Sequence, residues 1–302
     1  MSKPGDDRPC RRVELPGSRT LSIRPVQAHD APDLMTLYQS LSEDDRYCRF
    51  FTAHGPPRRT VEKLTKVEER GGFTLVAALT EADGSSHLVG EAGYAPLPNG
   101  NGELGITVAE PARGWLGPYL LDALVEQAAA RGVPNIEAQV LVVNRRMFSL
   151  LRRRGLVYLE QDEPSIAHVA IGTSGRVPTW PGGHERRRVL VEVPGGRWRS
   201  ERAARKAGFE VIACPGPLGG WARCPALRGE PCPLVAGADL VVDAVPDEPG
   251  RALLEAHQRM YPSVPVCMEV PSGGNDTVPR VGRRDPDGAV VEVLQRISKA
   301  IP

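Results

Sequence analysis

The sequence has little of several features that would mark a special class of protein. Six cysteines in 302 residues, unevenly spaced, are too few for a disulfide scaffold. Aromatic residues make up 5% of the chain, and no apolar run approaches the ~20 residues that span a bilayer. The N-terminal sequence MSKPGDDRPCRR has no apolar core of the kind found in signal peptides. We therefore expect reduced thiols, no membrane segment and a cytoplasmic protein.

An excess of charge of one sign is also missing. The chain carries 38 basic and 37 acidic residues, a net charge of +1, which argues against a general nucleic-acid binder. A composition of 41% hydrophobic and 25% charged residues is typical of soluble globular proteins. The length predicts about two domains of ~150 residues. Glycine and proline are abundant, at 32 and 29 residues, and residues 1–18 are expected to be poorly ordered.

The stretch from Glu103 to Leu156 shows a strand, a turn and a helix in succession. Residues 104–108 alternate in polarity as a half-buried strand does, and a turn rich in proline and glycine follows. From Leu116 onward the apolar residues recur with the helical period, which predicts a helix that ends at Gly132. A strand that enters a helix through such a turn directs unpaired N–H groups at one point, where a phosphate can bind. The alternative is an ordinary crossover of an α/β sheet.

A second strand and a short helix complete this stretch. Residues 136–143 are rich in β-branched side chains and predict the strand. Asn144 is placed to cap the helix, whose inward residues are expected to be Met147, Leu150 and Leu151. The segment NRRMFSLLRRRGL at 144–156, together with the order of elements before it, resembles the core of the GNAT superfamily of N-acetyltransferases. The resemblance implies an α/β fold with a GNAT-type mixed, mostly antiparallel sheet and flanking helices over residues 19–172.

The resemblance also implies a cosubstrate and a site. Acetyl-CoA would place its pyrophosphate on the backbone of the 112–118 loop, and its thioester carbonyl would bind a backbone N–H of the 104–108 strand. Glu103 would act as the base through a water molecule, with Glu91 in reserve, although either could be an exposed strand-edge carboxylate. No metal is expected. The residues assigned to the cosubstrate are Ile106, Thr107, Val108, Arg113, Gly114, Trp115, Leu116, Gly117, Pro118 and Asn144.

Three positions depart from the family pattern and keep two functions open. In the loop, Ala112 stands where the family has Gln or Arg, and Trp115 stands where the family has Gly. Only Gly117 matches the family pattern. Leu151 stands where the family usually has a tyrosine acid. One hypothesis is an N-acetyltransferase acting on an amine, either a small molecule or a protein lysine. The other is a catalytically inactive acyl-CoA-binding sensor.

The region before residue 103 fits the same domain. Residues 19–25, 73–79 and 87–94 read as strands of an antiparallel meander, and Asp30 is placed to cap a helix. The segment SLSEDDRYCRFF at 40–51 resembles bacterial protein lysine acetyltransferases. The alternative for this segment is structural, with Tyr47, Phe50 and Phe51 as core anchors.

The C-terminal part has a different character. Residues 173–187 lack periodicity and are interpreted as a linker with few contacts. Residues 188–302 alternate strands with helices, which predicts a doubly wound parallel α/β domain that weakly resembles receiver or flavodoxin-like domains. Asp243 lacks the acidic residues that hold Mg²⁺ in a receiver, so we expect no phosphorylation there but a regulatory or partner-binding role for the domain. Cys214, Cys224 and Cys232 lack the paired spacing of zinc sites and are expected to be buried thiols.

Overall fold

The computed structural model divides the chain into two compact units, Met1–Ala138 and Gln139–Pro302. The division falls inside strand β6 (Asn135–Leu141), upstream of the linker that the sequence predicts at 173–187. The structure describes residues 11–159, 163–174, 177–181, 186–216, 224–245, 247–270 and 279–300. Parts of the predicted linker, the residues at 217–223 between Cys214 and Cys224, and Cys10 lie outside the described residues.

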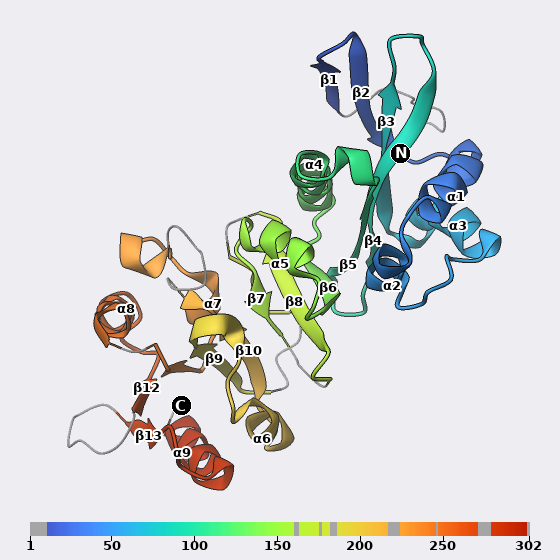
Figure 1. The fold of residues 1–302 in the computed structure, drawn as a ribbon. Coiled ribbons are helices and arrows are strands. Elements are labelled where there is room, and N and C mark those ends of the chain that lie inside the picture. The colour runs from blue at the N-terminus through green and yellow to red at the C-terminus, as the bar shows by residue number, and fades with distance from the viewer. Residues whose placement is uncertain are drawn as a thin grey trace. The chain divides into compact units, whose positions relative to one another are not determined.

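The first unit is built on a mostly antiparallel sheet, seen in the upper part of Figure 1. Its strands follow the order β1-β2-β3-β4-β5-β6. Strands β1 to β5 pair antiparallel with their neighbours, which confirms the predicted meander, whereas β5 and β6 run parallel. The bounds are β1 (Arg11–Leu15), β2 (Arg19–Pro25), β3 (Phe73–Thr80), β4 (Ser86–Pro96) and β5 (Gly102–Val108).

The hairpin of β1 and β2 was not expected from the sequence, which predicted disorder up to residue 18. Arg11–Leu15 pairs with Arg19–Ile23 in an unbroken register. The turn between them has only three residues, of which Gly17 and Ser18 adopt a positive φ of 80° and 55°, as residues in short hairpin loops often do.

Helices cover both faces of this sheet (Figure 1). Helix α4 (Leu116–Ala130) packs closely on one face, since a Cβ added at Gly90 of β4 would lie 2.7 Å from Leu120. The other face carries α1 (Ala31–Gln39), α2 (Glu43–Phe50) and α3 (Arg58–Leu64). Leu34, Leu37 and Tyr38 of α1 pack there against Val76 of β3.

Two sequence predictions for these helices are wrong. Asp30 does not cap α1 with its side chain; its carboxylate is buried and binds both terminal nitrogens of Arg24, at 2.6 and 2.7 Å, because a buried charge needs a partner. Tyr47 and Phe51 are not core anchors, with 48% and 37% of their surface exposed. Of the three aromatics only Phe50 packs inward, edge-on against Tyr38.

The second unit contains a parallel sheet of the order β10-β9-β11-β12-β13, joined on the β10 side by the antiparallel pair β7 and β8. The first strand of the parallel set, β9, lies between the second and the third, as the prediction of a doubly wound sheet requires. The strands are β7 (Val157–Tyr158), β8 (Ile166–Gly172), β9 (Arg188–Glu192), β10 (Glu210–Cys214), β11 (Leu240–Asp243), β12 (Val266–Val270) and β13 (Arg280–Gly282). The helices are α5 (Arg145–Arg152), α6 (Glu201–Lys206), α7 (Pro233–Ala236), α8 (Asp247–Met260) and α9 (Asp287–Lys299).

Packing in the second unit corrects two further predictions. Helix α5 buries Phe148 and Leu151, whereas Met147 and Leu150 are only half-buried. The predicted linker is not free of contacts, because Val177 and Trp180 lie in a hydrophobic cluster with residues of β9, β10 and α7.

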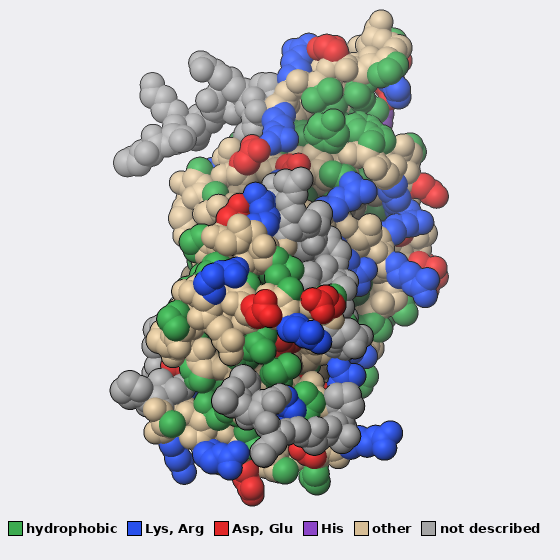
Figure 2. Space-filling view, turned by 90° about the vertical axis from the view of Figure 1, so that its left-hand side faces the viewer, with side chains coloured by type: hydrophobic (Ala, Val, Ile, Leu, Met, Phe, Trp, Pro, Cys, Tyr) green, Lys and Arg blue, Asp and Glu red, His purple; other side chains and the backbone are tan. Residues whose placement is uncertain are grey.

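None of the helices in the described ranges combines the length and the apolar character needed to cross a bilayer. On the face drawn in Figure 2, basic and acidic side chains are interspersed, in keeping with a net charge of +1.

Candidate active site

The central feature of the first unit is the point where β5 separates from β6. The two strands pair only at Gly102 with Ile136 and at Glu103 with Glu137. Beyond this point β5 continues to Val108, and β4 is its one pairing partner among the described strands. One edge of β5 is therefore left without a strand over residues 104–108.

The direction of the backbone groups on this edge follows from one hydrogen bond. The N–H of Ala109 donates to Val89 of β4 at 2.8 Å. Because successive N–H groups of a strand point to opposite edges, those of Ile106 and Val108 point to the unpaired edge. Both residues are among those that the sequence assigned to the cosubstrate.

A buried carboxylate and two side-chain amides hold β5 and β6 together just before the two strands separate. Glu137 of β6 is buried, and its Oε1 accepts hydrogen bonds from Asn99 Nδ2 at 2.8 Å and Asn101 Nδ2 at 2.6 Å. Glu103 stands opposite Glu137 in the register and is exposed. The predicted base thus lies at the mouth of the opening, on a strand held by a buried network.

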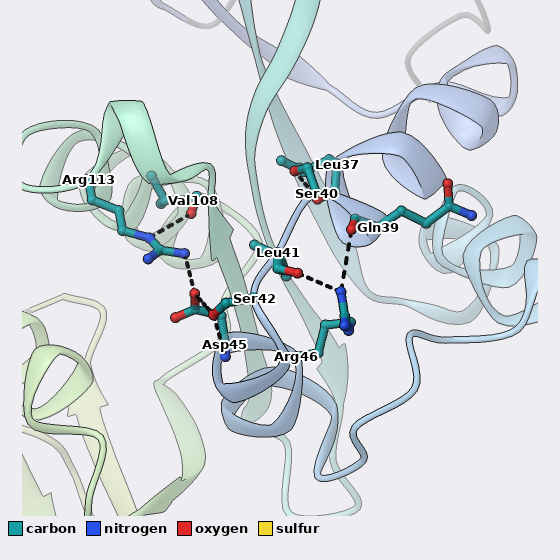
Figure 3. Close-up of polar contacts among 9 residues, drawn as sticks. All are labelled: Leu37, Gln39, Ser40, Leu41, Ser42, Asp45, Arg46, Val108 and Arg113. Carbon is teal, nitrogen blue, oxygen red and sulfur yellow. Dashed lines mark hydrogen bonds and ion pairs between the residues drawn. The ribbon is translucent and has the colours of Figure 1, made fainter.

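Arg113, in the loop between β5 and α4, binds this loop to the end of β5 and to helix α2 (Figure 3). Its Nε donates to the Val108 carbonyl at 3.3 Å, and its Nη2 donates to Asp45 Oδ2 of α2 at 2.7 Å. Asp45 also receives a hydrogen bond from Ser42, the N-cap of α2. Gly114 follows with φ of 93° and no atom within 4 Å of an added Cβ, so the chain turns there into open space.

Helix α4 begins where the sequence placed the phosphate loop. Trp115 is its N-cap, and its side chain accepts no hydrogen bond from the first N–H groups of the helix. Gly117 is the second residue and Pro118 the third, which confirms proline in the first turn. Leu116 contributes only backbone to this surface, because its side chain is fully buried.

Sequence reasoning missed a charged residue on the face of β4 and β5 that is turned away from helix α4. Arg49 of α2 donates from Nε to Thr107 Oγ1 and from Nη2 to Glu91 Oε1, both at 3.1 Å. Thr107 was assigned to the cosubstrate, but its hydroxyl is occupied by this contact. Arg49 and Glu91 are 42 positions apart in the chain, and no local pattern signals such a pair.

Asn144, the remaining predicted residue, lies in the second unit. Its Oδ1 accepts a hydrogen bond from Met147 N at 3.1 Å and caps α5, as the sequence predicted. The capping contact explains why an asparagine stands here. A role in holding the cosubstrate stays a prediction.

The second unit has its own group of buried polar side chains at the carboxyl ends of β9 and β11. Glu192 and Asp243 face each other in the register, and His257 Nε2 of α8 lies 3.4 Å from Glu192 Oε1. Burial raises the pKa of Asp243 to about 6 and lowers that of His257 to about 4. Burial, and then Asp243, raise the pKa of Glu192 well above its usual range.

Replacing Asp243 with Asn is expected to stabilise the protein at neutral pH. A carboxyl whose pKa is raised by folding binds its proton more tightly in the folded state, so its contribution to stability falls as the pH rises from about 4 to about 6. Glu192 acts in the same direction and His257 in the opposite one. Asn keeps the acceptor for the N–H of Val245 and carries no charge, so we expect a gain of roughly 1–3 kcal/mol at pH 7.

Urea unfolding followed by circular dichroism from pH 4 to pH 8 measures this effect. The difference between variant and wild type should vanish near pH 4, where the folded carboxyl is protonated. A difference that stays constant over the whole range would contradict the assignment of the effect to the Asp243 charge.

The cysteines of the second unit are buried thiols. Cys214 and Cys232 belong to one hydrophobic cluster and Cys224 to another. Burial raises the pKa of the Cys232 thiol to about 12 and also raises those of Cys214 and Cys224. Within the described ranges no group of three His, Cys, Asp or Glu side chains is arranged to hold a metal ion.

Comparison with known proteins identifies a family domain that begins in the first unit and extends past its end at Ala138. Residues 20–157 match the family model described as an acetyltransferase (GNAT) domain. The acetyltransferase Pat of Mycolicibacterium smegmatis is 28% identical over 144 residues, which cover 46% of this chain and 42% of that protein. The chain thus spans less than half the length of this relative.

Solved structures of related proteins cover the same half of the chain. The GNAT domain of S. lividans PAT covers 54% of this chain and 96% of its own, at 21% identity and a TM-score of 0.47. A cAMP-binding acyltransferase from Mycobacterium smegmatis covers 54% of this chain and 46% of its own, at 23% identity and a TM-score of 0.37. The family match thus identifies residues 20–157, less than half of this chain, as an acetyltransferase (GNAT) domain.

Proposed function

We propose that this protein transfers an acetyl group from acetyl-CoA to an amine, in a ternary complex of enzyme, acetyl-CoA and acceptor. The unpaired edge of β5 carries this proposal. GNAT acetyltransferases use acyl-CoA, and a strand edge with free N–H groups at Ile106 and Val108 is suited to bind the thioester carbonyl and the oxyanion that forms from it.

The reaction assigns one task to each part of the site. The N–H groups at the start of α4 and in the Arg113–Gly117 loop bind the pyrophosphate. Glu103 accepts the proton of the acceptor amine through a water molecule as the nitrogen attacks the carbonyl carbon. The C–S bond then breaks and CoA leaves as a thiolate, which with a thiol pKa of about 8.5 departs without a tyrosine acid.

A protein lysine is the acceptor that we propose. The support is the segment at 40–51, which resembles protein lysine acetyltransferases, and the similarity to the acetyltransferase Pat. The test is release of CoA thiol from acetyl-CoA in the presence of lysine-bearing proteins and of small amines. Release with proteins alone supports the proposal; release with small amines alone refutes the lysine acceptor, and no release with any acceptor refutes the transferase.

A second candidate is a sensor that binds acyl-CoA without turnover. It is favoured by Trp115, a bulky residue at the N-cap of α4 where the family has a small loop residue. Calorimetry that shows tight acetyl-CoA binding, together with no acetylated product from any amine, would favour this candidate.

The substitution Gly117→Asp is expected to weaken acetyl-CoA binding strongly. A carboxylate at the second position of α4 repels the pyrophosphate and fills space that the phosphate needs, so a loss of roughly 3 kcal/mol, about 100-fold in Kd, is expected by calorimetry. Gly288→Asp is the control, because it adds the same charge at the second position of another helix, α9, with no atom within 4 Å of an added Cβ. If the two variants bound acetyl-CoA with equal affinity, the pyrophosphate would not bind at this loop.

A further inference from the structure

The guanidinium of Arg49 lies flat against β5 at Gly105, in the part of the strand that no longer pairs with β6. The guanidinium contacts Thr107 on one side and Glu91 of β4 on the other. It rests on Gly105, where an added Cβ would lie 2.3 Å from Nη2 and 2.8 Å from Cζ. The flat contact is therefore possible only because residue 105 has no side chain.

The arginine is fixed in this position by a buried partner. Glu91 is 1% exposed, and burial and then this carboxylate raise the pKa of the nearby Tyr38 hydroxyl well above its usual range. Burial acts to lower the pKa of Arg49, but Glu91 and then Tyr38 outweigh it, and the pKa of Arg49 is raised. The guanidinium is thus always charged, and its fork geometry holds two partners at once.

The position of Arg49 matters because β5 has only one paired edge. Thr107 stands between Ile106 and Val108, whose N–H groups face the opening. A strand paired on one side is held less firmly than one inside a sheet, and two donors that bind an oxyanion must keep their positions closely.

We propose that Arg49 is a positioning residue that holds the unpaired part of β5 against β4 and α2, so that the N–H groups of Ile106 and Val108 stay aligned on the thioester carbonyl. This inference rests on the proposed function, in which the N–H groups of Ile106 and Val108 bind the thioester carbonyl. Arg49 acts through the strand and touches neither the acyl group nor the acceptor.

The test compares Arg49→Gln, Arg49→Lys and Gly105→Ala with the wild type in steady-state kinetics. We expect kcat to fall by ~10- to 100-fold in Arg49→Gln, with KM for acetyl-CoA within about twofold, because the carbonyl is misaligned while the pyrophosphate contacts remain. Arg49→Lys keeps the charge without the fork and should be intermediate. Gly105→Ala should match Arg49→Gln, since the new Cβ displaces the guanidinium. Glu43→Gln, an exposed change on the same helix, should behave as the wild type.

A double variant separates positioning from plain stability. Arg49→Gln leaves Glu91 buried and unpaired, which lowers the melting temperature by itself. Arg49→Gln with Glu91→Gln removes that charge, so the melting temperature should recover while kcat stays low. Recovery of kcat together with stability would overturn the proposal, as would unchanged kcat in both Arg49→Gln and Gly105→Ala.

Hydrogen exchange tests the inference independently of turnover. The amides of Gly105, Thr107 and Ala109 face β4, and they should exchange faster in Arg49→Gln than in the wild type if Arg49 holds the strand. If the wild type acetylates no amine, the proposed function fails, and faster exchange still supports the role of Arg49. Unchanged exchange rates overturn that role whatever the activity of the wild type.

Discussion

The substitution Glu103→Gln is expected to lower kcat by ~100- to 10,000-fold and to leave acetyl-CoA affinity unchanged. Gln has the size of Glu but cannot take a proton from the amine. Glu103 is exposed at the mouth of the opening, opposite the buried Glu137, so the change removes no packing. The melting temperature should stay the same.

Rapid-quench measurement of acetyl transfer and calorimetry of acetyl-CoA binding check this expectation. Glu69→Gln, which alters an exposed carboxylate near the start of β3, is the matched control. A kcat within threefold of the wild type would show that Glu103 is a surface carboxylate. Glu91 would not replace it readily, because its Oε1 is already bound to Arg49.

The substitution Trp180→Ala is expected to destabilise the second unit by about 3–5 kcal/mol, as for other large aromatic side chains removed from a core. Trp180 is buried, and its Nε1 donates to the Leu234 carbonyl at 2.7 Å. The guanidinium of Arg188 lies over its ring, 5.3 Å from the centroid. The substitution therefore leaves a cavity and an unpaired carbonyl.

Urea unfolding followed by circular dichroism gives the free energy, and hydrogen exchange in β9 and β10 shows which part of the chain loses stability. Trp180→Phe, which keeps most of the volume and loses the hydrogen bond, should cost about 1–2 kcal/mol. A loss below 1 kcal/mol in Trp180→Ala would mean that residues 173–187 behave as the free linker that the sequence predicted.

The sequence predicted those elements whose signals are local. The apolar stripe of α4, its termination just before Gly132, whose φ is 76°, and the cap at Asn144 each depend on residues within a few positions of one another. Local patterns also predicted the strands of the meander and the alternation of the second unit. The pairing of β3 with β4 and of β4 with β5 followed because short turns join these neighbours, whereas α1, α2 and α3 lie between β2 and β3 in the chain.

Predictions that required long-range packing were less successful. Tyr47 and Phe51 are large and apolar, and only the docking of α2 through Arg49 and Asp45 shows that they face solvent. Asp30 binds Arg24 and does not cap α1, because its carboxylate is buried and a buried charge needs an oppositely charged partner. The sequence alone does not show that this residue is buried. The role of Trp180 was hidden by the proline- and glycine-rich composition around it.

Helix α2 contains no fully buried residue, and it is held by the packing of Phe50 on Tyr38 and by the contacts of Arg46, Arg49 and Arg113. Its outer face, which includes Asp44, Tyr47 and Phe51, therefore contributes little to the free energy of folding, and exposed substitutions of this kind usually change stability by less than ~0.5 kcal/mol. This makes α2 a region where the sequence can vary at little cost to the fold. If the acceptor approaches over this face, its preference can be redesigned there one residue at a time without rebuilding the core.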